Sequence, residues 1–249
     1  MDITNLDYFS LLVTLKLAGI VTPILLLLCL PLSYWLATSN ASWRQYVEAA
    51  CNLPMVLPPT VLGFGLLMLM SPISPVGELW FAITGSNLTF TFTGLVIGSL
   101  IYSLPFGILP MRTAFEKIDK GIIEAARCLG MTHFQTFIHV ILPNAIGGIT
   151  ASTALIFAHT VGEFGIALMI GGSIPGETKV TSIAIFEHTE SLEYGSAAML
   201  SIILMLISYC ALVFISNHNK PQKKRITISP KRHPKPCTSK KERVSHGTC

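Results

Sequence analysis

The sequence predicts an all-α integral membrane protein with about five transmembrane helices. Only 12% of its 249 residues are charged, whereas an ordinary soluble domain carries about 25%. Its mean hydropathy is +0.61. Five stretches are apolar over the ~20 residues that a helix needs to cross a bilayer. Together these observations exclude a typical water-soluble globular enzyme.

The predicted spans follow these apolar stretches in chain order. They cover Leu11–Leu36, Leu53–Met70, Gly94–Met111, Ala145–Ile170 and Ala197–Ser216. We expect internal prolines and glycines to break several of them; the prolines are Pro23, Pro31, Pro58, Pro59, Pro105 and Pro110. In a membrane bundle, neighbouring helices or a polar cavity satisfy the backbone groups that such breaks leave free.

Positive charge sets the expected orientation, since cytoplasmic segments of membrane proteins collect Lys and Arg. Residues 218–249 hold ten of the seventeen Lys and Arg residues. We therefore divide the chain into a membrane domain, residues 1–217, and a basic, disordered, cytoplasmic tail, residues 218–249. With five spans the N-terminus lies outside. Only Lys16 and Lys179 then remain at the outer side.

The stretch at residues 112–143, between the third and fourth spans, is too polar to cross a membrane. Ile122, Ile123, Ala126 and Leu129 recur at helical spacing. Gly130 stands where a left-handed cap ends a helix. Thr132 and Gln135 have the spacing of a capping box for a second helix, which Pro143 ends. The stretch therefore predicts two short helices on the cytoplasmic side, a suitable docking surface.

This loop resembles the EAA loop of ABC-importer permeases. The matching positions are Glu124-Ala125-Ala126, Gly130, Val140 and Leu142-Pro143, with Val140 where the family usually has Ile. The resemblance implies a type I ABC importer transmembrane domain (MetI-like). It also implies that Glu124, Ala125, Ala126, Gly130, Leu142 and Pro143 dock on a cytoplasmic ATPase subunit. The alternative is an amphipathic hairpin that lies on the membrane surface.

Three further segments resemble the permeases of molybdate importers. They are the proline-rich Leu53–Gly63, Gly162-Glu163-Phe164-Gly165, and Ile174-Pro175-Gly176-Glu177-Thr178. Sulfate/thiosulfate permeases share the first two; the third is closer to the molybdate branch. The resemblance implies a second copy of this chain, two copies of the ATPase subunit and a periplasmic anion-binding protein. No cofactor is implied for this chain, because ATP and magnesium serve the ATPase.

Candidate residues for a translocation path or gate are Lys16, Pro58, Pro59, Thr60, Gly162, Glu163, Phe164 and Gly165. Ionisable groups inside spans are costly and usually face an interior cavity. Lys16 either extends to the membrane interface or faces the path. Glu163 either bonds to helix ends or holds a gate closed, and His159, four residues earlier, is a candidate partner. No nucleophile or metal ligand accompanies them, so we predict neither a catalytic nor a metal site.

One motif points to a nucleotide site that we reject. Gly171, Gly176, Glu177 and Thr178 have the spacing of a phosphate-binding loop, but Glu177 occupies the lysine position and would repel phosphates. The segment also falls on the outer side. ATP hydrolysis must therefore come from another polypeptide.

The sequence thus predicts the permease subunit of an ATP-driven oxyanion importer in the inner membrane, with molybdate as the expected anion. A sulfate/thiosulfate permease is the first alternative. A secondary transporter or channel that uses Lys16 and Glu163 is the second. A membrane anchor whose basic tail binds nucleic acid is the third, and the lack of aromatic residues for base stacking in that tail argues against it.

Overall fold

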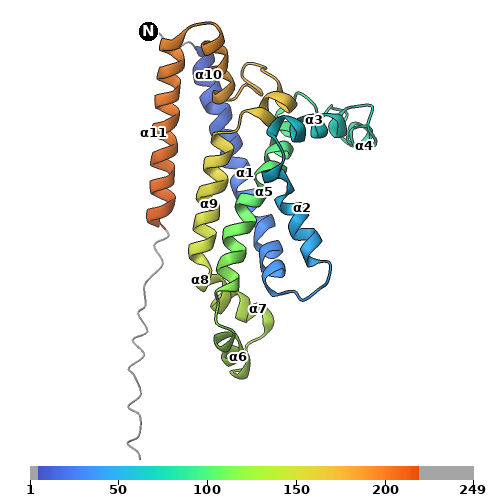
Figure 1. Cartoon of the computed structure of the whole chain (residues 1–249), viewed down its shortest axis with the longest axis vertical. Helices are drawn as coiled ribbons and strands as arrows, with labels where there is room; N and C mark the ends of the chain where they lie inside the picture. Colours follow the sequence, from blue (N-terminus) through green and yellow to red (C-terminus); the bar gives the residue numbers. More distant parts are fainter. Residues whose placement is uncertain (1–4, 219–249) are drawn as a thin grey trace, which may run out of the picture.

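The computed structural model describes residues 5–218, and every regular element in that range is a helix (Figure 1). In chain order the elements are α1 (Asn5–Thr38), α2 (Arg44–Val56), α3 (Pro59–Met70), α4 (Pro75–Thr84), α5 (Phe92–Glu116), α6 (Lys120–Cys128), α7 (His133–Thr136), the π-helix η1 (Phe137–Ile141), α8 (Leu142–Asn144), α9 (Ile146–Val161), the π-helix η2 (Ala167–Gly171), α10 (Thr181–Glu190) and α11 (Tyr194–His218).

The core is built by α1, α5 and α9, which lie side by side (Figure 1). Small residues let their backbones approach. A Cβ added to Gly107 of α5 would lie 2.6 Å from the Cys29 Sγ of α1. The Ser152 hydroxyl of α9 donates to the Gly107 carbonyl at 2.8 Å. Because apolar burial gives little net gain in lipid, such close packing and interhelical hydrogen bonds hold a membrane bundle together.

Three of the predicted spans are confirmed as long apolar helices. The segments Tyr8–Thr38, Phe92–Glu116 and Tyr194–Ile215 are each long and apolar enough to cross a bilayer. The expectation that internal prolines break these spans is wrong for α1 and α5, which run through their prolines without interruption. Each proline removes one backbone donor, and a helix packed on its neighbours tolerates that loss.

The other two predicted spans are wrong as single helices. The segment Leu53–Met70 is divided between α2 and α3, which meet at 112°. The segment Ala145–Ile170 is divided because α9 ends at Val161. The described residues contain three candidate spans, or up to five if each bent pair counts as one, the second pair being His133–Asn144 with α9. The count of five stays a prediction.

The two ends of the bundle carry different elements. The start of α1 and the helix α10 lie at one end, whereas α6 and α7 lie at the other; α11 starts near the first end and stops well before the second (Figure 1). The start of α1 and the 112–143 loop therefore lie at opposite ends of the bundle, and the side of the membrane on which each lies stays a prediction. The predicted tail lies outside the described residues except for His218, which ends α11.

A network of four charged side chains fastens α2 to α5 near the end that carries α6. Arg112 binds Glu48 of α2, and its Nε donates to the Glu116 carboxylate at 2.8 Å. Arg44 reaches the same Glu116 oxygen at 3.2 Å. The two cations thus alternate with two acids. These ion pairs hold α2 against α5 before the chain bends into α3.

Candidate functional site

The segment Gly162–Gly165 interrupts the chain between α9 and η2. Gly162, at φ −86° and ψ 0°, is the C-terminal cap of α9. Glycine is a poor helix former, so the helix ends there at little cost. The Glu163 carbonyl accepts a hydrogen bond from the Ser182 hydroxyl of α10 at 2.6 Å. The break is therefore a fixed feature of the fold rather than a frayed helix end.

The bend between α2 and α3 comes from two consecutive prolines. Leu57 and Pro58 are extended, with ψ 140° and 137°, because a residue before proline is disfavoured in the helical region. Pro59 then opens α3 at its first position, where the missing N–H is tolerated. A Cβ on Gly165 would lie 2.9 Å from the Pro59 Cβ. The proline bend and the Gly162–Gly165 break are therefore in direct contact.

A cavity of about 480 Å³ opens where these two segments meet. Its lining residues come from α3, α5, α9 and the break after α9; they are Pro59, Thr60, Tyr102, Ala158, His159, Gly162, Glu163, Phe164 and Gly165. Six of the eight residues predicted for the path are among them. Pro58 immediately precedes Pro59 and is absent from the lining, as is Lys16. The structure thus brings together residues about 100 positions apart in the sequence.

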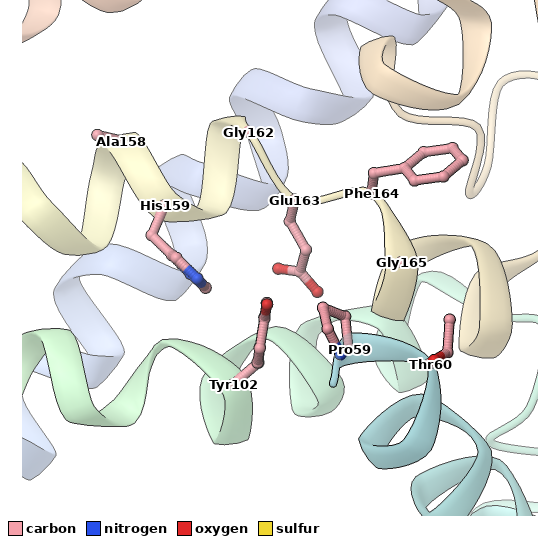
Figure 2. Close-up of a pocket in the computed structure, with 9 residues that line it drawn as sticks. All are labelled: Pro59, Thr60, Tyr102, Ala158, His159, Gly162, Glu163, Phe164 and Gly165. Carbon is pink, nitrogen blue, oxygen red and sulfur yellow. The ribbon is translucent and has the colours of Figure 1, made fainter. Parts of the chain in front are cut away.

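Of the acidic residues in the described part of the chain, Glu163 alone lines this cavity. It is 4% exposed. Its Oε2 accepts a hydrogen bond from the Ser99 hydroxyl of α5 at 2.8 Å, whereas its Oε1 is buried and has no hydrogen-bond partner among residues 5–218. Figure 2 shows the carboxyl of Glu163, the hydroxyl of Tyr102 and the imidazole of His159 pointing toward one another.

The predicted pair between His159 and Glu163 does not form. The His159 Nδ1 instead lies 2.9 Å from the Ser103 hydroxyl of α5, which also lies 3.3 Å from the Thr160 hydroxyl. The imidazole stacks on Phe106 with ring centroids 4.1 Å apart. Serine hydroxyls of α5 lie beside α9, and His159 and Glu163 bond to them. The pair between His159 and Glu163 that their four-residue spacing suggested therefore does not form.

Lys16 lies in a different part of the molecule. Its Nζ sits 4.4 Å from the centre of the Phe92 ring, at the start of α5. It borders a smaller cavity with Glu177, near the end of the bundle that carries α10. Of the two expectations for Lys16, this exposed position favours the interfacial one.

The segment Ile174–Thr178 forms a closed loop. The Ile174 carbonyl accepts hydrogen bonds from the backbone N–H groups of Glu177, Thr178 and Lys179, at 3.2, 3.0 and 3.0 Å. The buried Thr178 hydroxyl donates to the Gly171 carbonyl at 2.6 Å. A phosphate-binding loop needs such amides free to face the ligand, so this geometry adds a third reason to reject a nucleotide site here.

The second candidate site is the helical pair at residues 112–143, whose local structure is as predicted. Gly130 has φ +84°. Its N–H donates to the Arg127 carbonyl, and the N–H of Met131 donates to the Ala126 carbonyl, which is the bonding pattern of a Schellman cap. Thr132 and Gln135 form both hydrogen bonds of the capping box. Pro143 is included in α8, so the helical path ends at Asn144 rather than at Pro143.

The pair presents a mixed surface. Ala126 is buried, whereas Glu124, Ala125 and Gly130 are exposed. Two large apolar side chains also face outward, Leu129 at 85% and Phe134 at 72% exposed. Leu142 is half-buried and Pro143 exposed. The helical stripe inferred from sequence is thus divided, since Ala126 packs inward and Leu129 points away.

Phe137 of η1 anchors this loop to the bundle. Its ring lies edge-on to Tyr34 of α1, with centroids 5.0 Å apart. Tyr34 makes a similar contact with Phe115 of α5 at 5.6 Å. The loop is therefore joined through Tyr34 to two helices of the core, α1 and α5.

Sequence reasoning missed the polar residues that α5 contributes to the first site. Ser99 and Ser103, four residues apart, bind Glu163 and His159 respectively. The available signal was their helical spacing, with Tyr102 between them, inside an apolar run. Among the described residues no group of three or more His, Cys, Asp or Glu side chains is arranged to hold a metal ion.

Comparison with known proteins gives a consistent result. The model of the family described as "Binding-protein-dependent transport system inner membrane component" matches residues 29–224. The Azotobacter vinelandii "Molybdenum transport system permease protein ModB" is 42% identical over 212 residues, covering 85% of this chain and 94% of that protein. The Escherichia coli (strain K12) protein of the same name is 31% identical, covering 84% and 93%. The E. coli (strain K12) "Sulfate transport system permease protein CysT" is 32% identical, covering 70% and 62%.

Solved structures agree at the level of fold. A chain of a bacterial ABC transporter that imports the acidic polysaccharide alginate superposes with a TM-score of 0.72 at 16% identity, covering 89% of this chain and 82% of that one. A chain of the MetNI methionine ABC transporter, in an inward-facing conformation, gives 0.63 at 18% identity, covering 88% and 100%.

Proposed function

This chain belongs to the family of binding-protein-dependent transport system inner membrane components, and from that membership we propose how it works. It is the permease subunit of an ATP-driven importer, and the oxyanion it carries is molybdate. One observation supports the choice of anion. The match to a molybdenum permease is 42% identical and extends over 94% of that protein. The match to a sulfate permease is 32% identical and extends over 62%.

The chain works with other subunits, because it hydrolyses no ATP itself. Its partners are two copies of an ATPase subunit, a periplasmic anion-binding protein and a second copy of this chain. The exposed surface of α6 and α7, with Glu124, Ala125, Gly130, Leu129 and Phe134, docks on the ATPase. ATP and magnesium act there. A solved structure of similar fold is that of a bacterial alginate ABC transporter in complex with a pentasaccharide-bound periplasmic protein, which supports this kind of assembly.

The cavity beside the proline bend belongs to the translocation path. Closure of the ATPase dimer moves α6 and α7, and the Phe137–Tyr34 contact passes that motion to α1. We assign the change of shape to the bend at Pro58–Pro59 and the break at Gly162–Gly165, where the regular helical hydrogen bonding is already interrupted. The two states must differ in their affinity for anion and nucleotide, since a ligand shifts an equilibrium only through such a difference.

The orientation that we propose places the N-terminus outside, and α6, α7 and the C-terminal tail in the cytoplasm. Support comes from five positive residues at the start of α2, at the end of α5 and in α6; they are Arg44, Arg112, Lys117, Lys120 and Arg127. The positive-inside rule assigns such segments to the cytoplasm.

The decisive experiment compares anion uptake in a strain that lacks its own molybdate and sulfate permeases. The strain carries this gene with its ATPase and binding protein. We expect uptake of labelled molybdate that excess sulfate does not suppress. Sulfate uptake without molybdate uptake would assign the chain to the sulfate permeases, to which it is also related. Uptake that persists in the absence of the ATPase would favour the secondary transporter and contradict the proposal.

A further inference from the structure

The Oε1 atom of Glu163 is the one feature of the cavity that the proposed function leaves unexplained. The atom is buried, lies beside the cavity and forms no hydrogen bond within the described residues. Buried polar atoms are satisfied in the great majority of cases. A covered and unsatisfied carboxyl oxygen on a residue that lines a cavity therefore marks a place where a small movement of the side chain would let it bind a partner during the transport cycle.

The surroundings decide which protonation state the carboxyl holds. Within residues 5–218, no Lys or Arg lines the cavity. The ionisable side chains that face Glu163 are Tyr102 from α5 and His159 from α9, whereas α3 adds only Pro59 and Thr60 to the lining. Only Ser99 donates a hydrogen bond to the carboxyl. An ionised carboxylate with one donor and no cation nearby is costly to bury, so the environment favours the neutral acid.

We propose that Glu163 carries a proton and donates a hydrogen bond from Oε1 to the tetrahedral oxyanion in this cavity. The inference rests on the proposed oxyanion import and deepens it, because it assigns the anion a specific contact. An ionised Glu163 would repel a dianion, whereas the neutral acid offers it a donor. A group that appears unfavourable for an anion path thus becomes part of the path.

Two neighbours complete the set of donors. The Tyr102 hydroxyl points toward the same space (Figure 2). The Ser103 hydroxyl lies 2.9 Å from the His159 Nδ1; when it donates to that atom, the ring proton is on Nε2 and serves as a third donor. A fully ionised oxyanion only accepts hydrogen bonds, so a cavity that presents three neutral donors suits it. Neutral donors also bind less tightly than a buried cation, and a site on a path must release its ligand.

The test uses the complete transporter, with its ATPase and binding protein, reconstituted in lipid vesicles. Infrared difference spectroscopy detects the carbonyl stretch of a protonated carboxylic acid, and ATP-driven uptake of labelled molybdate is measured in parallel. The variants are Glu163→Gln, which keeps a neutral donor, and Glu163→Ala, which removes it. The matched control is Glu190→Gln, at an exposed acid on α10. Ser99→Ala removes the bond to Oε2 and shifts the Glu163 band, which identifies the band even if Glu163→Gln fails to assemble.

We expect the wild-type carrier to show the acid band, the band to move when molybdate but not chloride is added, and Glu190→Gln to retain it. Glu163→Gln keeps uptake within about threefold of wild type. Glu163→Ala lowers it about tenfold or more, as expected for the loss of a hydrogen bond to a charged group. A wild-type band that is absent or insensitive to molybdate, or lost uptake in an assembled Glu163→Gln carrier, overturns the inference. A wild-type carrier that takes up no molybdate would instead overturn the proposed function.

Discussion

At the residue scale, the positions with unusual backbone geometry or unusual charge carry the clearest consequences. Gly130 adopts φ +84° with nothing within 4 Å of its missing Cβ. Space is therefore available for a side chain, and only the left-handed backbone opposes one. Glu187 is unusual for its partners: it binds the Lys179 ammonium and the Ser173 hydroxyl beside the closed loop at Ile174–Thr178.

The first prediction concerns Gly130→Val. A β-branched residue in the left-handed region costs roughly 1–2 kcal/mol, so the Schellman cap that orients α6 against α7 opens. We expect normal membrane insertion but a several-fold loss of uptake per ATP hydrolysed. Gly19→Val is the matched control, since that α1 position also has open space and lacks a positive φ. Normal coupling in the Gly130 variant would contradict the docking role of the helical pair.

The second prediction concerns the pH dependence at Glu187. Burial by itself would raise the pKa of this carboxyl, but the hydrogen bonds from Lys179 and Ser173 and the Lys179 charge outweigh it, and the pKa is lowered. A lowered native pKa stabilises the fold above the unfolded value of about 4.3. That stabilisation is lost as pH falls through the native pKa.

We therefore expect the melting temperature of the wild-type protein to drop more steeply below about pH 5 than that of Glu187→Gln. Thermal unfolding in detergent between neutral and acidic pH measures the difference. Glu190→Gln, at an exposed acid in the same helix, should follow the wild-type curve. Parallel curves for the wild type and Glu187→Gln would show that the ion pair contributes nothing to the pH dependence.

At the element scale, two contacts decide how the peripheral helices are held. The α6–α7 pair reaches the core through Phe137, and its outer face remains exposed. The α2 helix reaches the core through the charge network with α5. In both cases specific polar or aromatic contacts join a peripheral helix to the bundle, and apolar side chains such as Val47, Cys51 and Ile123 pack in the same core cluster.

The third prediction concerns Leu129 on the outer face of the helical pair. Leu129 is 85% exposed, so Leu129→Asp leaves the folded permease intact and removes an apolar contact from the docking surface. Loss of a central interface residue costs about 2 kcal/mol, or roughly thirtyfold in affinity. Co-purification of the ATPase subunit measures the effect, and Leu192→Asp, exposed at the opposite end, is the control. Equal recovery of the ATPase with both variants would remove this surface from the interface.

The fourth prediction concerns the ion pair between Arg112 and Glu48. Both side chains are partly exposed, so their coupling is modest, about 1 kcal/mol. A double-mutant cycle with Arg112→Gln and Glu48→Gln, read by thermal unfolding in detergent, isolates the pair. Because Arg112 also binds Glu116, the single variant Arg112→Gln should destabilise more than Glu48→Gln. A coupling of zero would mean that the bend into α3 is held by other contacts.

At the scale of the whole molecule, the described residues form a packed core and outer helices that few other helices bury. The helices α1, α5 and α9 bury one another, whereas α11 is mostly exposed along its length. Such an apolar exterior suits contact with lipid. The basic segment at residues 219–249 lies outside the described residues.

The fifth prediction concerns that segment. Truncation after His218 should leave uptake and assembly unchanged at matched expression, because a segment so basic and poor in large apolar residues cannot bury enough surface to offset its chain entropy. Its Lys and Arg residues add about 1 kcal/mol each only where they lie near an anionic membrane surface. Loss of uptake with normal insertion would instead assign the segment a part in the transport cycle.

Local features were accessible from the sequence alone. The Gly130 cap, the capping box at Thr132 and three long apolar helices depend on backbone preference and hydropathy within a few neighbouring residues. A different argument, resemblance to a known family, grouped the proline-rich segment with Gly162–Gly165. Physical spacing by itself gave no reason for those two segments to touch.

Only the tertiary structure decided where the helices bend and which groups meet. Tolerance of proline depends on whether neighbouring helices satisfy the freed backbone, so Pro31 and Pro105 lie in unbroken helices while Pro58 marks a 112° bend. Likewise, the four-residue spacing of His159 and Glu163 suggested a pair, but Ser99 and Ser103 bind them separately from another helix. A buried polar group bonds to whichever helix packs beside it. The packing of helices depends on contacts between residues far apart in the chain, which the local sequence does not reveal.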